Sequence, residues 1–75
     1  MEYIHIVLEH TPGQEDTRQV AGLFGKQVKA REWVETRQNE ERELGEAVTV
    51  FTIETWGKGQ DDDALWYPIG QYTCR

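Results

Sequence analysis

Residues 20–34, VAGLFGKQVKAREWV, constrain the fold of this chain more than any other segment. A short alternating apolar run passes through Gly25 directly into a helical pattern, whose apolar residues share one face at i, i+3 and i+4: Ala30, Trp33 and Val34. This predicts a strand that feeds a helix over residues 26–44. Gly45 is the residue type at which such a helix ends.

Strands are predicted on both sides of this segment. Residues 3–8 alternate between strongly and weakly apolar side chains, which is the period-2 pattern of a strand. Residues 10–18, HTPGQEDTR, combine a Pro-Gly pair with polar residues and predict a long loop. The first strand and a return strand over residues 19–24 would therefore form a hairpin with a long tip.

Two further strands are predicted after the helix. Residues 47–56 are rich in β-branched and aromatic side chains on both faces, which favours a central strand. Residues 57–63 form a polar, acidic tip, and residues 65–74 return as a last segment. Pro68 restricts that segment to an edge strand or a broken one.

Together these elements predict a single α+β domain over residues 1–75, with one helix on an antiparallel sheet of three or four strands in ββαββ order. The predicted strand order is return strand, first strand, post-helix strand, last strand. The first strand presents a strongly apolar face of Ile4, Ile6 and Leu8 to the helix. The sheet face opposite the helix is expected to carry Tyr3, His5, Val7, Val48 and Val50.

Charge and composition narrow the class of partner. A formal net charge of −6 opposes attraction to phosphate backbones and anionic lipid, so a protein with a basic surface is favoured over direct nucleic-acid or membrane binding. No apolar run resembles a signal peptide or a membrane span, and Cys74 is the only cysteine. We therefore expect a soluble, cytoplasmic protein.

The residues that carry enzyme chemistry are sparse. The chain contains no serine, which excludes serine-nucleophile mechanisms. Cys74 is expected to be an exposed, free thiol near the chain end, and His5 a half-exposed sheet residue. His5 and His10 have an odd separation and should point to opposite sheet faces, without a metal-ligand spacing. We predict no enzyme, no metal and no cofactor.

Partner binding is predicted from aromatic and acidic residues. Four large side chains gather near the C-terminus and either cap the core or form an exposed patch, the type of surface that is enriched in binding hot spots. In the second interpretation the anchors are Trp66, Tyr67 and Tyr72, and the acids that steer the partner are Asp61, Asp62, Asp63, Glu40, Glu41 and Glu43.

The pattern of two strands, a GLFG segment and a helix resembles small ββαβ domains of uncharacterised phage and bacterial proteins, over about residues 3–56. The matching positions are Gly22, Phe24, Ala30, Trp33 and Val34, whereas Gly25 replaces the usual Ser or Thr helix cap. The resemblance implies a fold and no activity. In size, acidity and element order the chain is also similar to small phage anti-CRISPR proteins, which are non-enzymatic inhibitors.

Two functions from different classes follow as hypotheses. The first is a phage- or mobile-element-encoded protein-binding module that inhibits a host nucleic-acid-processing complex, which would place it in the host cytoplasm. The alternative is a homo-oligomeric structural or accessory protein, since a one-helix sheet leaves one face open to a second copy.

Overall fold

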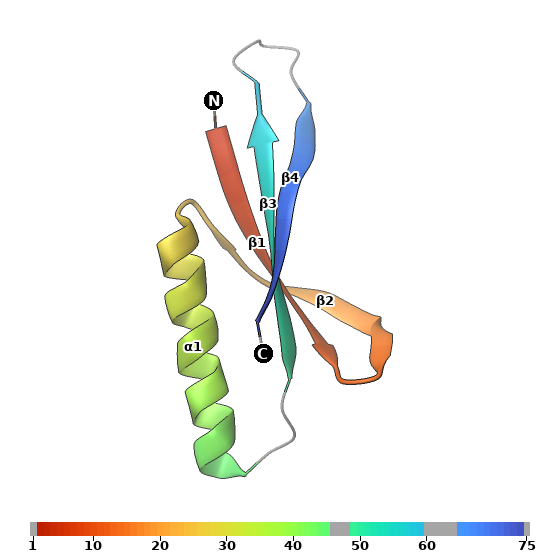
Figure 1. The fold of residues 1–75 in the computed structure, drawn as a ribbon, viewed down its shortest axis with the longest axis vertical. Coiled ribbons are helices and arrows are strands. Elements are labelled where there is room, and N and C mark those ends of the chain that lie inside the picture. Colours follow the sequence, from red (N-terminus) through yellow and green to blue (C-terminus); the bar gives the residue numbers. More distant parts are fainter. Residues whose placement is uncertain (1, 46–48, 60–64, 75) are drawn as a thin grey trace.

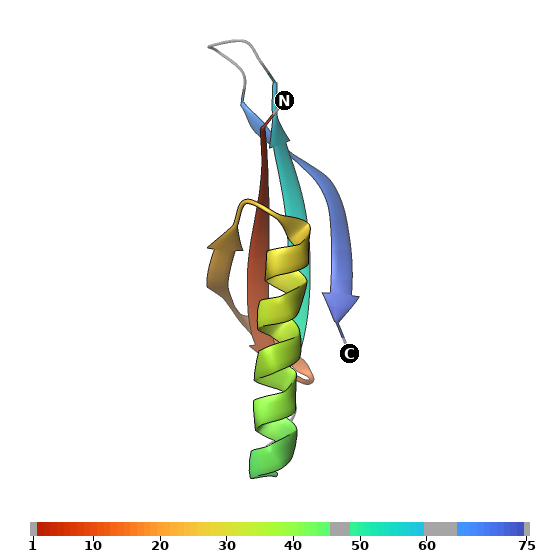
Figure 2. The same cartoon turned by 90° about the vertical axis from the view of Figure 1, so that its left-hand side faces the viewer.

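The computed structural model describes residues 2–45, 49–59 and 65–74. Its four strands form one antiparallel sheet in the order β2-β1-β3-β4, and the helix lies along one face of it (Figures 1 and 2). The elements are β1 Glu2–Thr11, β2 Gln14–Phe24, α1 Gln27–Leu44, β3 Val50–Lys58 and β4 Trp66–Cys74. The predicted α+β class, element order and strand order are confirmed.

The β1–β2 hairpin closes through a tight turn, so the prediction of a long loop over residues 10–18 is wrong. Pro12 and Gly13 are the only residues between the two strands, and Gly13 has a φ of 80°, which suits the position after proline in a type II turn. The Thr17 hydroxyl donates to the Gln14 carbonyl at 2.7 Å and accepts the Thr11 N–H at 3.1 Å. The residues on either side of this turn are exposed and polar, and they pair as a two-stranded ribbon outside the core. Because they lack an alternating hydrophobic pattern, their sequence does not indicate a strand.

Helix α1 begins and ends close to the predicted residues. Lys26 occupies the N-cap without a side-chain hydrogen bond, and Gly45 is the C-cap with a φ of 70°. Leu44, the last residue of α1, is exposed. Contacts of α1 go mainly to β1, β2 and β3.

On β1 the helix covers the opposite face from the one predicted, whereas Val50 of β3 lies on the face away from the helix, as expected. The core between α1 and the sheet consists of Val7, Ala30, Val34, Phe51 and Ile53. Trp33 lies between two aromatic rings, with centroids 6.2 Å from Phe24 and 5.9 Å from Phe51.

This aromatic cluster explains the side on which the helix lies. His5, Val7 and Glu9 share one face of β1. Phe24 pairs with His5 and Phe51 with Glu9, so both phenylalanines point to the side of Val7. The chain leaves β2 at Phe24 and therefore enters α1 on that side. His5 and Val7 are buried beneath the helix, while Ile4 and Ile6 face away from it; Val48 lies outside the described residues.

A β-bulge shapes the C-terminal edge of the sheet. β4 pairs antiparallel with β3, with Thr55 opposite Gly70 but Trp56 opposite Pro68, so Ile69 is an extra residue. β4 is an edge strand in the described sheet, as Pro68 predicts. Gly57, which was expected in the tip, belongs to β3, is buried, and leaves the space that the Ile69 side chain occupies.

Substituting Gly57 by alanine should lower stability relative to Gly70→Ala by about 1–2 kcal/mol, the usual cost of mild overpacking. A Cβ at residue 57 would meet the end of the Ile69 side chain, whereas a Cβ at residue 70 has open space. Urea unfolding of the two variants measures the difference. In an Ile69→Ala background the difference should vanish; its persistence there would show that another contact is responsible.

Candidate functional site

α1 leaves one face of the sheet uncovered. One half of that face is apolar, and we call this half the open apolar face. Its side chains border a shallow hollow of about 340 Å³ and are Ile4, Ile6, Leu23, Trp56 and Trp66. The strand register places them together: Ile4 pairs with Trp56 and Ile6 with Leu23, on the side away from the helix. The Trp56 Nε1 is enclosed without a hydrogen-bond partner among the described residues, so apolar contacts alone hold this indole.

A second exposed surface lies on the helix side of β4 and consists of Tyr67, Ile69 and Tyr72, which we call the tyrosine side. The bulge at Ile69 puts both tyrosines on this side, since Tyr67 pairs with Gly57 and Tyr72 with Ile53. Tyr67 is 42% exposed and Tyr72 50%. The Arg31 guanidinium lies 4.9 Å from the centre of the Tyr72 ring, a cation–π contact that fixes one end of this surface.

The three predicted aromatic anchors therefore do not form one patch. Trp66 pairs with Lys58 and belongs to the open apolar face, while Tyr67 and Tyr72 lie on the other side of the sheet. All three are exposed, so they do not cap the core.

The predicted steering acids are likewise separated from the aromatic residues. Glu40 and Glu43 are exposed in the last turns of α1, and Glu40 lies 3.8 Å from the Arg37 guanidinium. Figure 1 shows that end of α1 at the opposite end of the molecule from the start of β4. Asp61, Asp62 and Asp63 lie outside the described residues.

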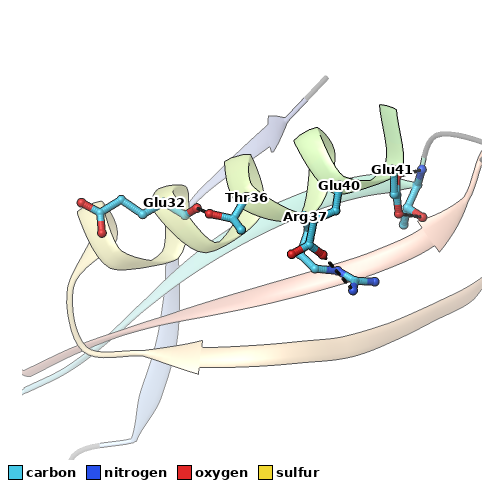
Figure 3. Close-up of polar contacts among 6 residues, drawn as sticks. Glu32, Thr36, Arg37, Glu40 and Glu41 are labelled. Atoms are coloured by element: carbon cyan, nitrogen blue, oxygen red, sulfur yellow. Dashed lines mark hydrogen bonds and ion pairs between the residues drawn. The ribbon is translucent and has the colours of Figure 1, made fainter. Parts of the chain in front are cut away.

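Glu41 differs from the other predicted acids, because its side chain is buried, with only 7% exposed. Its carboxylate accepts the Thr49 N–H at 2.9 Å and the Thr49 hydroxyl at 2.6 Å; Figure 3 shows it near the end of α1, apart from the Arg37–Glu40 pair. Burial by itself would raise the pKa of Glu41, but these two hydrogen bonds and the nearby Arg37 charge together hold it below its ordinary value. Glu41 ties α1 to the start of β3 and is not a surface steering charge.

The residues considered for metal or thiol chemistry are dispersed. His5 is buried on the helix side, where Nδ1 shares a 2.9 Å hydrogen bond with the Thr55 hydroxyl, so our expectation of a half-exposed His5 is wrong. His10 pairs with Val50 on the other side of the sheet, as the odd separation predicts. In the described part of the chain no three His, Cys, Asp or Glu side chains gather as a metal site.

Cys74 is free, as predicted, but it is partly buried against the core and not exposed. Burial raises the pKa of its thiol, and the Arg31 charge offsets only part of that effect. A thiol held in its protonated form is a weak nucleophile.

Sequence reasoning missed the contributions of Leu23 and Trp56 to the open apolar face. The signal that could have found them is register: a hairpin with a two-residue turn and one bulge places Leu23 beside Ile6, and Trp56 follows opposite Ile4. Without that register, the two residues are simply apolar positions in separate strands.

Across residues 2–45, 49–59 and 65–74, no helix combines the length and the apolar character that crossing a membrane requires. Comparison with known proteins gives no matching family model, no similar curated protein and no similar solved structure.

Proposed function

We propose that this chain is a non-enzymatic protein-binding module and that its partner engages β4. One observation carries the proposal: every residue from Trp66 to Thr73 is exposed, although the strand bears four large apolar or aromatic side chains. Exposed aromatic residues on an edge strand offer both hot-spot side chains and backbone groups to a partner.

Net charge indicates the kind of partner. The chain carries −6, and four of the acids on α1 are exposed: Glu32, Glu35, Glu40 and Glu43. They contribute to the long-range field that attracts a basic protein. A basic groove of a host nucleic-acid-processing complex is the partner that this charge favours, and the module would then act as its inhibitor.

The test is affinity capture with the tagged chain from the cells in which it is encoded, read by mass spectrometry. The double variant Tyr67→Ser/Tyr72→Ser should lose a partner that Val28→Ser retains, because Val28 is as exposed as the tyrosines but lies on α1. Capture of a basic partner should weaken when NaCl rises from about 0.05 M to about 0.5 M. A partner held equally by both variants would contradict the role of β4.

A further inference from the structure

We propose that Glu41 is an acid-sensitive latch: when its carboxylate is protonated, the second half of α1 unwinds while the sheet and the first half of the helix stay folded. We call this second half, residues 35–44, the latched segment. It belongs to a different element from β4, so the proposal stands whether or not a partner engages β4.

The first half of α1 is held by the core. Ala30 and Val34 are buried between the helix and the sheet. The Trp33 ring contacts the rings of Phe24 and Phe51. All three helical residues of this cluster precede the latched segment, so the first half keeps these contacts when the second half unwinds.

The latched segment has one buried anchor. All ten of its residues are described, and among them only Glu41 is buried, Gln38 is half-buried and the others are exposed. Figures 1 and 2 show the last turns of α1 extending past the end of the sheet. Within the described residues, the two hydrogen bonds of Glu41 with Thr49 are the only side-chain hydrogen bonds that join this segment to a residue outside the helix.

Without this anchor the latched segment is a weak helix. The Arg37 guanidinium lies 3.8 Å from the Glu40 carboxylate and 5.9 Å from the centre of the Trp33 ring, and both contacts stay within α1. Exposed ion pairs add little stability, and the acidic Glu40 and Glu43 lie near the negative end of the helix dipole. Because isolated helices shorter than about 12 residues are marginal in water, release of Glu41 favours unwinding.

Protonation weakens both hydrogen bonds of the latch in one step. The ionised carboxylate accepts the N–H and the hydroxyl of Thr49, and such bonds are roughly twice as strong as those to a neutral acceptor. On α1 the Arg37 charge favours the ionised form of Glu41. On β1 the titratable groups beside Thr49 are Glu9 and His10, which border a hollow of about 330 Å³ with it. The latch is therefore closed while Glu41 is ionised and opens as falling pH protonates it.

The first test is amide exchange detected by NMR at pH 7. Glu41→Gln places a neutral side chain of the same size at the latch, so protection of the amides of residues 39–44 should fall at least about tenfold. Amides of β1 and of residues 31–34 should keep their protection. Thr49→Val removes one donor without changing the helix and should act in the same direction. Glu40→Gln, at an exposed neighbouring position, should have no effect.

The second test is a pH titration of the wild type. Cα chemical shifts of residues 39–44 should move toward unfolded values as the pH falls below 4.5, together with the titration of the Glu41 carboxyl. In Glu41→Gln they should no longer change over this range. Shifts that stay constant while Glu41 titrates, or that still change with pH in Glu41→Gln, would assign no latch to this carboxylate.

The exchange data can also overturn the proposal. Wild-type protection of residues 39–44 in Glu41→Gln would show that other contacts hold the segment. Equal loss of protection in β1, or failure of Glu41→Gln to fold, would show that Glu41 supports the whole domain and not one segment. None of these results bears on capture through β4, which uses a different surface.

Discussion

Replacing Phe51 by alanine is expected to destabilise this protein by about 3–5 kcal/mol, the usual cost of removing a fully buried phenylalanine. Phe51 is fully buried, and its ring meets that of Trp33 edge-on at an interplanar angle of 89°. Domains of this length have total stabilities of about 4–11 kcal/mol, so the variant should lose a large share of its stability and unfold at a much lower urea concentration than the wild type. Urea unfolding followed by circular dichroism measures the change.

Tyr3→Ala is the matched control, because Tyr3 is an aromatic residue on the same side of the sheet but is half exposed. We expect it to cost less than about 1 kcal/mol. Equal losses for Phe51→Ala and Tyr3→Ala would mean that α1 does not cover the face on which Phe51 lies.

The second large effect is expected at Glu41. Glu41→Ala should cost about 1.5–3 kcal/mol at pH 7, because hydrogen bonds to a charged group are worth that much and the Thr49 N–H and hydroxyl lose their shared acceptor. Glu40→Gln is the control, since Glu40 forms only an exposed ion pair; it should change stability by less than about 0.5 kcal/mol. Chemical unfolding of both variants compares them directly.

This stabilisation should depend on pH. The pKa of Glu41 in the folded protein lies below its ordinary value of 4.5, so the folded state binds the proton less readily than the unfolded state. The contribution is therefore complete above pH 4.5 and is lost as the pH falls through the folded-state pKa. The stability gap between wild type and Glu41→Ala should shrink on acidification; a gap that grows below pH 4.5 would contradict the lowered pKa.

The sequence allows prediction of element order and strand order, because local patterns define them. Helical spacing of Ala30, Trp33 and Val34 predicts the helix, Gly45 its end, and Pro68 an edge strand. These features depend on residues close together in the chain, so no tertiary information is needed to interpret them.

The sheet face covered by the helix could not be predicted in the same way. Judged alone, β1 favours burial of Ile4, Ile6 and Leu8, which are more hydrophobic than Tyr3, His5 and Val7. The outcome depends on Phe24 and Phe51, whose rings hold Trp33 on the side of Val7. A pattern with period 2 shows which residues share a face, but partner strands decide which face is buried.

The prediction that the C-terminal aromatic residues form one exposed patch was wrong for similar reasons. Trp66 and Tyr67 are adjacent in sequence and consequently point to opposite sides of β4, while a bulge at Ile69 returns Tyr72 to the side of Tyr67. Glu41 is one of several glutamates in a polar helical segment, and only its contact with Thr49 distinguishes it from exposed Glu40.

The most direct test of the proposed function is amide hydrogen exchange of the chain alone and with its captured partner. If the partner engages β4, exchange should slow from Trp66 to Cys74 on binding, because the partner covers the exposed edge strand, while amides of α1 around Val28 keep their rates. Slowed exchange confined to α1, with β4 unchanged, would contradict the proposal that β4 is the binding strand.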